Sequence, residues 1–194
     1  EGSDSPDVDG ILTSSGLEPE WHKIDCALPP GMSADEVVAA LSCYLGRIGG
    51  KSRIRVSYVD DDLSALADTH SGFIAPSVPL TFDVTADSTI EALKQHVLLE
   101  LAEFRRRGGC SVDLMSRIPG FTARPSTVAI RQTVDAALHS SGLTGSALTF
   151  VVPPDGRPLR ILFDETRLKK SAAQSLAAHV EIALAGLAAL DGSQ

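Results

Sequence analysis

The sequence contains little cysteine, and its three cysteines stand far apart. Cys26, Cys43 and Cys110 form no C-x-x-C pair within the 194 residues. An odd, sparse set is not the framework of a disulfide-rich secreted protein, and a cysteine-type structural zinc site needs close pairs. The first residues are acidic and polar, whereas a secretory signal is basic and then apolar. We therefore expect reduced thiols and a cytoplasmic protein.

Positive charge and long apolar runs are also scarce. Lys and Arg number 17 against 25 Asp and Glu, which gives a formal net charge of −8. Nucleic acids and anionic lipid surfaces attract basic proteins, so neither is an expected partner. No continuous run of about 18 apolar residues occurs, so we predict no membrane-spanning helix. The hydrophobic fraction of 43% excludes a disordered chain and predicts one globular core.

The common catalytic and cofactor motifs are missing as well. The sequence has no G-x-G-x-x-G, no G-x-S-x-G and no H-x-x-x-D, and these absences exclude the usual dinucleotide and nucleophile-elbow signatures. Cys110 has no histidine close to it in sequence. His96 and Glu100 share a helix face, but a metal site needs a further ligand. We therefore predict no catalytic residue, no metal-ligating residue and no cofactor.

Charge is distributed unevenly along the chain. Six of the 25 acidic residues precede Lys23, the first basic residue, and the remaining chain has 19 acidic and 17 basic residues. Residues 1–19 also contain several Gly, Ser and Pro and little hydrophobic periodicity, a composition typical of disorder. We predict a disordered acidic lead over residues 1–19 and one folded domain over residues 20–194.

Alternating apolar residues predict six strands in the folded domain. The expected strands cover residues 21–28, 52–60, 78–84, 127–134, 147–152 and 159–163. Pro153-Pro154-Asp155-Gly156 lies between the last two, and its Asp-Gly step predicts a hairpin.

Apolar residues at helical spacing predict three amphipathic helices. The expected helices cover residues 34–48, 90–107 and 168–190, with short helical turns between 61 and 76 and at 112–117. Capping boxes formed by Ser33 with Glu36 and by Ser88 with Glu91 mark the first two helix starts. The order of elements predicts an α/β fold in which a mixed sheet carries helices packed on one face.

Three long segments resemble a known family. They are SADEVVAALSCYLGRIGG, SGFIAPSVPLTFDVTADSTIEALKQHVLLELAEF and LTFVVPPDGRPLRILFDETRLKKSAAQSLAAHVEIALAGLAAL. In order and spacing they resemble the C-terminal half of a nonribosomal peptide synthetase condensation domain, a member of the chloramphenicol-acetyltransferase-like superfamily. The sequence departs from that pattern where an Asn-Thr pair is replaced within Ala75-Pro76-Ser77, and where a His and a Pro-Phe motif are replaced within residues 109–114. The segment DLMSRIPGF looks like truncated condensation-like regions that precede adenylation domains.

The resemblance implies a role without catalysis. In the family the catalytic histidine belongs to an HHxxxDG motif in the other half of the domain, and this sequence has no such motif. A truncated condensation-like domain would pack against or recruit an adenylation or carrier domain of the same or a partner synthetase, or a tailoring enzyme acting in trans. Two alternatives stay open: half of an acyltransferase whose other half supplies the histidine, and a free-standing protein-binding domain unrelated to peptide synthesis.

Two surface features are candidate docking sites for a partner. Arg105, Arg106 and Arg107 end the second predicted helix, where cations favour the helix dipole. Carrier proteins of the family are acidic, so the same three arginines are also a candidate docking site for one. An exposed sheet edge is a second candidate, because it can accept a partner strand.

Overall fold

A computed structural model describes residues 18–49, 53–83, 89–112, 126–135, 139–154 and 156–191. This part of the chain contains six strands and four helices. The strands are β1 (Trp21–Cys26), β2 (Arg53–Asp60), β3 (Val78–Asp83), β4 (Val128–Gln132), β5 (Leu148–Val152) and β6 (Leu159–Asp164). The helices are α1 (Ala34–Ile48), α2 (Asp61–Thr69), α3 (Ile90–Arg107) and α5 (Lys170–Asp191). The predicted α/β class and the order of the predicted strands are confirmed.

The six strands form one mixed sheet in the order β1-β6-β5-β4-β2-β3. Strands β2, β4 and β5 run parallel to one another, and the pairs β1–β6, β5–β6 and β2–β3 are antiparallel. The predicted β5–β6 hairpin is therefore present. The edges of the sheet are β1 and β3, which the sequence left unassigned.

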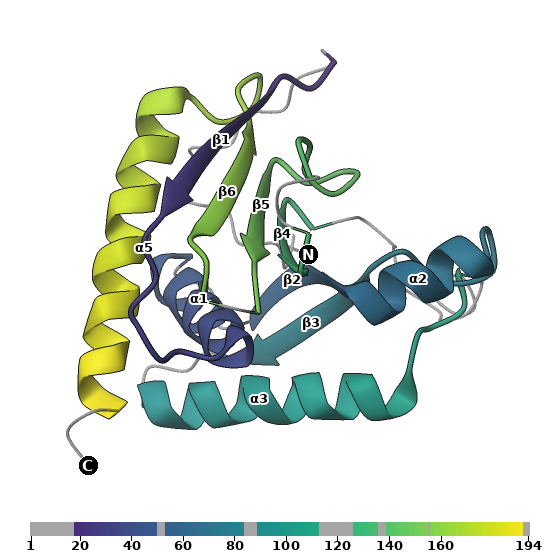
Figure 1. Cartoon of the computed structure of the whole chain (residues 1–194), viewed down its shortest axis with the longest axis horizontal. Coiled ribbons are helices and arrows are strands. Elements are labelled where there is room, and N and C mark those ends of the chain that lie inside the picture. The colour runs from purple at the N-terminus through teal and green to yellow at the C-terminus, as the bar shows by residue number, and fades with distance from the viewer. Residues whose placement is uncertain are drawn as a thin grey trace.

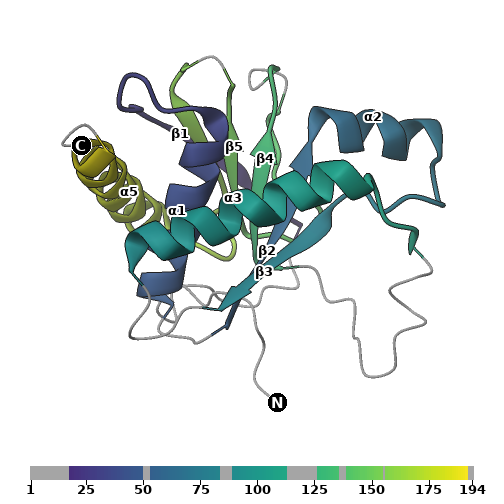
Figure 2. The ribbon, with the colours of Figure 1, turned by 90° about the horizontal axis from the view of Figure 1, so that it is seen from below.

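Three helices cover one face of the sheet. Figure 2 shows α1, α3 and α5 on the same side of the strands, whereas α2 extends away from the end of β2 (Figure 1). The strand residues that point toward these helices are apolar and fully buried, as alternation along a strand requires. They include Ile54, Val56 and Tyr58 of β2, Leu148 and Phe150 of β5, and Ile161 and Phe163 of β6.

Local sequence signals explain where α1 begins and α3 ends. Ser33 accepts a hydrogen bond from the Glu36 backbone N–H, and the Glu36 carboxylate accepts from the Ser33 N–H at 2.8 Å, so the predicted capping box is confirmed. At the end of α3, Gly108 adopts a φ of +75°, a backbone region that glycine enters without steric cost.

The second predicted capping box is wrong. The N-cap of α3 is Thr89, whose hydroxyl accepts from the Ala92 N–H at 3.1 Å. The carboxylate of Glu91 accepts instead from the Gln95 side chain, one turn along the helix. Ser88 and Thr89 are neighbours, and both serine and threonine are common N-cap residues. The sequence pattern therefore pointed to Ser88, whereas the N-cap is Thr89.

One further expectation needs correction. The short turn predicted between residues 61 and 76 is the nine-residue helix α2, whose N-cap Asp60 accepts from the Leu63 N–H at 2.9 Å. Helix α5 is long and apolar enough over Lys170–Ala189 to cross a membrane by length and composition, although only 28% of that window is buried. One such helix is weak evidence of a membrane span, because mostly buried core helices of soluble proteins pass the same test.

Some predictions fall outside the described residues. Residues 1–17 of the predicted acidic lead and nearly all of the predicted turn at 112–117 are among them, as is Asp155 of the hairpin loop. The division into a lead and one folded domain therefore stays a prediction.

Candidate functional site

Arg105 lies at the centre of a polar network where parallel strands end. Its guanidinium donates to both carboxylate oxygens of Asp35, at 2.5 and 2.7 Å, and to the side-chain oxygen of Gln132 at 3.1 Å. The Tyr58 hydroxyl donates to the same Gln132 oxygen at 2.6 Å. The four residues come from α1, β2, α3 and β4. The network therefore joins the first turn of one helix to the last turn of another across the carboxyl ends of β2 and β4.

The environment of the network fixes its protonation. The hydrogen bonds from Arg105 lower the pKa of Asp35 below its ordinary value of 3.8, although partial burial opposes the shift. Burial raises the pKa of the Tyr58 hydroxyl, and the charge of Asp60 adds to the effect. At neutral pH the network therefore holds a carboxylate, a guanidinium and a neutral phenol, none of which is set up as a general base.

Arg106 and Arg107 occupy a different environment from Arg105. Both side chains are 70% exposed, and both contact the carboxylate of Glu103 on the preceding turn of α3, at 2.7 and 2.6 Å. The hydrogen bond from Arg106 is the largest cause that lowers the pKa of Glu103 to about 2. The three predicted arginines thus divide into Arg105, which is 37% exposed and held by the network, and two residues that are 70% exposed. Their docking role stays a prediction, and only Arg106 and Arg107 are placed for it.

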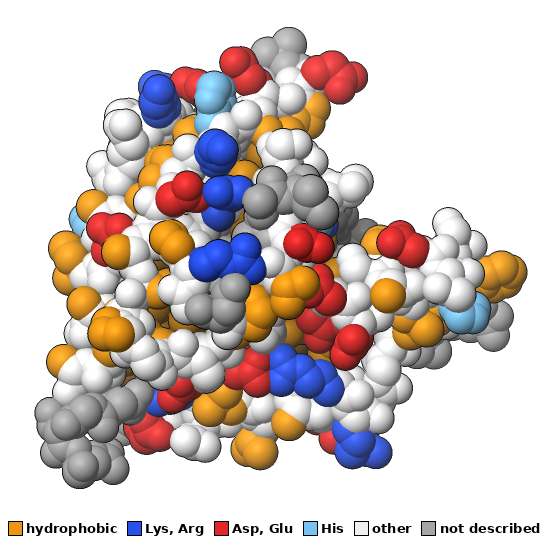
Figure 3. Space-filling view, in the orientation of Figure 1, with side chains coloured by type: hydrophobic (Ala, Val, Ile, Leu, Met, Phe, Trp, Pro, Cys, Tyr) orange, Lys and Arg blue, Asp and Glu red, His pale blue; other side chains and the backbone are white. Residues whose placement is uncertain are grey.

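The surface over this network has a small hollow and carries both acidic and basic side chains. Figure 3 shows acidic side chains gathered over the start of α2, with basic side chains below them over the C-terminal half of α3. A hollow of about 90 Å³ lies there, between Asp60 and Leu63 on one side and Phe104 and Arg105 on the other. Ligand sites for small molecules are several times larger. The hollow therefore suits surface contact and not enclosure of a substrate.

A larger cleft, of about 510 Å³, lies at the opposite end of the sheet beside Trp21. Leu143, Asp164 and Arg167 also line it. Asp164 is buried and accepts from the Thr166 hydroxyl at 2.7 Å, and Arg167 donates to the Gly145 carbonyl at 3.2 Å. The charged groups of the cleft are thus held by neighbouring protein groups. The sequence did not single out this cleft, because its walls come from segments more than 100 residues apart.

The cysteines and histidines form no nucleophile–base pair in the described parts of the chain. Burial raises the pKa of Cys26 and of Cys43 to about 11, and it also raises the pKa of Cys110. His139 lies against the guanidinium of Arg131, and both burial and that charge lower its pKa. This contact joins β4 to a loop and gives no sequence signal.

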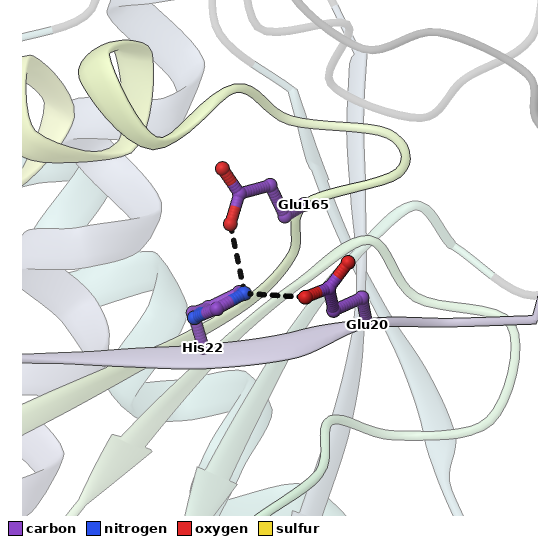
Figure 4. A group of neighbouring side chains, drawn as sticks. All are labelled: Glu20, His22 and Glu165. Carbon is purple, nitrogen blue, oxygen red and sulfur yellow. Dashed lines mark ion pairs between the residues drawn. The ribbon is translucent and has the colours of Figure 1, made fainter.

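One histidine lies among carboxylates. His22 is within 3.4 Å of Glu20 and 2.8 Å of Glu165 (Figure 4). Asp25 is three residues further along the sequence, but it points to the other face of the strand, where it contacts Arg160 at 2.8 Å. Glu165 is 143 residues away in sequence, so only the β1–β6 pairing reveals the cluster.

Comparisons with known proteins identify the fold. The sequence matches no family model, and no curated protein matches it. Among solved structures, it matches the first condensation domain of the calcium-dependent antibiotic synthetase with a TM-score of 0.63 and 16% identity, over 96% of this chain and 49% of that chain. The starter condensation domain of rhizomide synthetase, in a mutant bound to C8-CoA, matches with a TM-score of 0.66 and 13% identity, over 97% and 49%.

A third matching structure is a complex of two proteins. The X-domain in a complex with OxyB from teicoplanin biosynthesis matches with a TM-score of 0.59 and 18% identity, over 85% of this chain and 45% of that chain. This chain therefore spans about half the length of the solved structures it matches. Its six-stranded mixed sheet with helices on one face is the fold of one half of a condensation domain.

Proposed function

We propose that this chain is a non-catalytic, condensation-like domain of a nonribosomal peptide synthetase. Its role is to pack against or recruit a neighbour, which is an adenylation domain, a carrier domain or a tailoring enzyme acting in trans. The observation that carries the proposal is a condensation-type half fold in a sequence that lacks the HHxxxDG motif.

The chemistry of the strand-end network supports this role. Arg105, Asp35, Tyr58 and Gln132 satisfy one another by hydrogen bonds. A catalytic group needs access to substrate and a suitable protonation state, and this network offers a hollow of only about 90 Å³. Groups held in this way stabilise a scaffold.

One of the matched structures gives the proposal a precedent. The X-domain of teicoplanin biosynthesis is held in a complex with a second protein, OxyB. A condensation-type fold is therefore compatible with protein recruitment. For this chain, we expect its partners among the proteins encoded beside it.

Two assays of the purified chain test the proposal together. The first mixes it with aminoacyl- and peptidyl-loaded carrier domains and follows peptide bond formation by mass spectrometry, and we expect no product. The second measures binding to the adenylation and carrier domains encoded nearest to it by calorimetry, and we expect a stable complex with at least one. Product formation by this chain alone would contradict the proposal, as would no binding to any encoded neighbour.

The second candidate is an enzyme fragment, favoured by the same half-length match. In that case the other half supplies the catalytic histidine, and the two halves form one acyltransferase. The genomic sequence on either side of this chain separates the candidates. An HHxxxDG segment encoded upstream in the same reading frame supports the fragment, whereas an adenylation domain directly downstream without that segment supports recruitment.

Charge reversal tests which surface binds the partner. We expect Arg106→Glu with Arg107→Glu to weaken carrier binding about tenfold or more, because both side chains are exposed and an acidic partner would be repelled. Lys169→Glu with Lys170→Glu is the matched control, since it makes the same charge change on exposed residues beside α5. Equal binding by both double variants would remove the arginines from the interface.

A further inference from the structure

Three potential metal ligands meet where β1 pairs with β6. The register places Trp21 opposite Asp164, so Glu20 lies opposite Glu165, and the Glu165 N–H donates to the Glu20 carbonyl at 2.8 Å. His22 is two residues along β1 from Glu20, and side chains two apart share a face of a sheet. Figure 4 shows the imidazole and both carboxylates converging. One ligand atom from each residue lies within 4.8 Å of the others.

The backbone holds these positions firmly. The Glu20 N–H donates to the buried carboxylate of Asp164 at 3.0 Å, and the same oxygen accepts from the Thr166 N–H and hydroxyl. Asp164 thus ties the start of β1 to the turn after β6. These hydrogen bonds therefore hold Glu20 and Glu165 next to each other.

The two neighbouring carboxylates of the cluster favour a bound cation. Like charges directly opposite each other on paired strands are destabilising, and Glu20 and Glu165 form such a pair. With a neutral imidazole at His22 the three side chains carry a formal charge of −2. A single divalent cation between them would neutralise that charge.

The imidazole of His22 is oriented for such an ion. Its ring stacks on Phe163, with centroids 5.6 Å apart and an interplanar angle of 29°, so the ring plane is fixed by the core. Its Nε2 is buried yet makes no hydrogen bond of good geometry, although two carboxylate oxygens lie within 3.4 Å of it. When an imidazole nitrogen binds a metal ion, its lone pair points at the ion and not at the other ligands. The other ligand atoms are therefore close to the nitrogen without being in line for a hydrogen bond to it.

One of the two distances from the imidazole matches a zinc site. Zinc binds imidazole nitrogen and carboxylate oxygen at about 2.0–2.2 Å, so two ligands of a tetrahedral ion are about 3.4 Å apart. The Nε2 of His22 is 3.4 Å from Glu20 and 2.8 Å from Glu165. The Glu165 spacing is the shorter of the two, so zinc binding requires its carboxylate to move about 0.6 Å away from the imidazole. The exposed side of Glu20 leaves room for water as the fourth ligand.

We propose that Glu20, His22 and Glu165 bind one Zn²⁺ ion, which links the first strand to the turn after β6. One imidazole and two carboxylates favour zinc over Mg²⁺, which prefers an all-oxygen octahedral shell. The site is separate from the strand-end network, and it does not depend on the proposed function. Its role is structural, because three ligands from one strand pair hold the edge strand β1 in register.

Metal titration of the full chain tests the site. The chelator-treated protein is titrated with Zn²⁺ against a chromophoric competitor, and we expect one equivalent to bind and the unfolding temperature to rise with free Zn²⁺. The isosteric variant Glu165→Gln and the variant His22→Gln are each expected to lower the affinity about tenfold or more. His179→Gln, which changes an exposed histidine of α5, is the matched control and is expected to bind as the unmodified chain does.

Two further measurements make the outcome decisive. Circular dichroism of each metal-free variant shows whether it folds, and Glu165→Gln serves if His22→Gln does not fold. With Co²⁺ as a probe, we expect no strong thiolate charge-transfer band. Equal Zn²⁺ affinity in all variants, a thiolate band from Cys110, or no stoichiometric binding would each overturn the proposal and leave the cluster as an ion pair.

Discussion

Arg105 and Arg106 are neighbours in sequence, but their side chains contact different elements of the fold. Arg105 contacts residues from α1, β2 and β4, whereas Arg106 contacts Glu103 on its own helix. Arg105→Ala removes two charge-assisted hydrogen bonds to Asp35 and leaves that carboxylate without its cation. Since the Arg105 side chain is 37% exposed, we expect a loss of about 1–2 kcal/mol in the free energy of unfolding.

Arg106→Ala is the matched control for this prediction. It removes an exposed ion pair within one helix, and solvent screens such pairs, so we expect a smaller loss of stability than for Arg105→Ala. Urea unfolding of both variants measures the difference. Equal stability of the two variants would mean that the strand-end network does not hold α1 and α3 to the sheet.

The pH dependence of stability gives a second residue-scale prediction. The pKa of Asp35 is lowered in the folded chain, chiefly by the hydrogen bonds from Arg105. A lowered pKa stabilises the folded state above the ordinary value of 3.8, and this stabilisation is lost as pH falls through the lowered pKa. We expect Asp35→Asn to be about 1 kcal/mol less stable than the unmodified chain at pH 7, with the gap closing below about pH 4.

Urea unfolding between pH 7 and pH 2.5 measures this gap, and Arg105→Gln provides the control background. In that background the carboxylate has lost its main partner, so Asp35→Asn should leave little pH-dependent difference. A gap of unchanged size at low pH, or one that persists in the Arg105→Gln background, would mean that the pair with Arg105 is not its cause.

What the sequence could predict at the residue scale depended on distance along the chain. The contacts of Ser33 with Glu36 lie within one helical turn, so the pattern revealed them. The partner of Arg105 is 70 residues away and that of His22 is 143 residues away. The run of three arginines indicates the end of a helix, but it does not distinguish Arg105, which contacts other elements, from the two that contact their own helix.

At the scale of elements, the loop before β5 packs against the edge strand β1. A Cβ atom at Gly142 would lie 2.2 Å from the Trp21 ring and 2.7 Å from the Thr149 hydroxyl. Thr149 is buried, and its hydroxyl accepts from the Leu143 N–H at 3.0 Å, so it cannot withdraw without losing a partner. We expect Gly142→Ala to destabilise the chain by about 1–3 kcal/mol through overpacking.

Gly186→Ala is the matched control for this contact. A Cβ atom at Gly186 would meet nothing within 4 Å, and alanine is a better helix former than glycine by about 1 kcal/mol. Thermal unfolding should therefore show opposite shifts for the two alanine variants. A stabilised Gly142→Ala variant would mean that the loop does not pack against Trp21.

Elements with a strong period were predictable, and short elements were not. The alternating pattern of β2 and the spacing in α3 gave their bounds within a few residues, because each buries one continuous apolar face. Helix α2 buries only Leu63 and Ala67, so its pattern is too short to distinguish a helix from a turn. Its start is explained by the Asp60 cap, which reads in sequence as the end of a strand.

At the scale of the whole molecule, the order of strands predicted the class of fold but not the arrangement of the sheet. The parallel pairing of β2 with β4 joins segments separated by α2, β3 and α3, and no local signal specifies such a crossover. The arrangement brings the ends of β2 and β4 together, and with them the network around Arg105. The predicted fold class was therefore correct, while its polar sites needed the three-dimensional structure.

The place of α5 in the whole molecule can be tested directly. Its composition allows a membrane span, but its buried face lies against α1 and β1, where Cys26 donates from its thiol to the Ala177 carbonyl at 3.9 Å. Val180 is fully buried on that face and Ile182 is 70% exposed. We expect Val180→Asp to cost about 3 kcal/mol or more, because a carboxylate enters the core, and to unfold the sheet with the helix in one transition.

Ile182→Asp changes the opposite face of α5 and is the matched control. If α5 is a core helix, this variant unfolds within about 0.5 kcal/mol of the unmodified chain, and neither protein floats with phosphatidylcholine vesicles. If α5 spans a bilayer, the unmodified chain floats with the vesicles and Ile182→Asp does not, because a charge in the hydrocarbon core is costly. Urea unfolding and vesicle flotation of the same two variants therefore distinguish an integral helix of the α/β core from a membrane anchor.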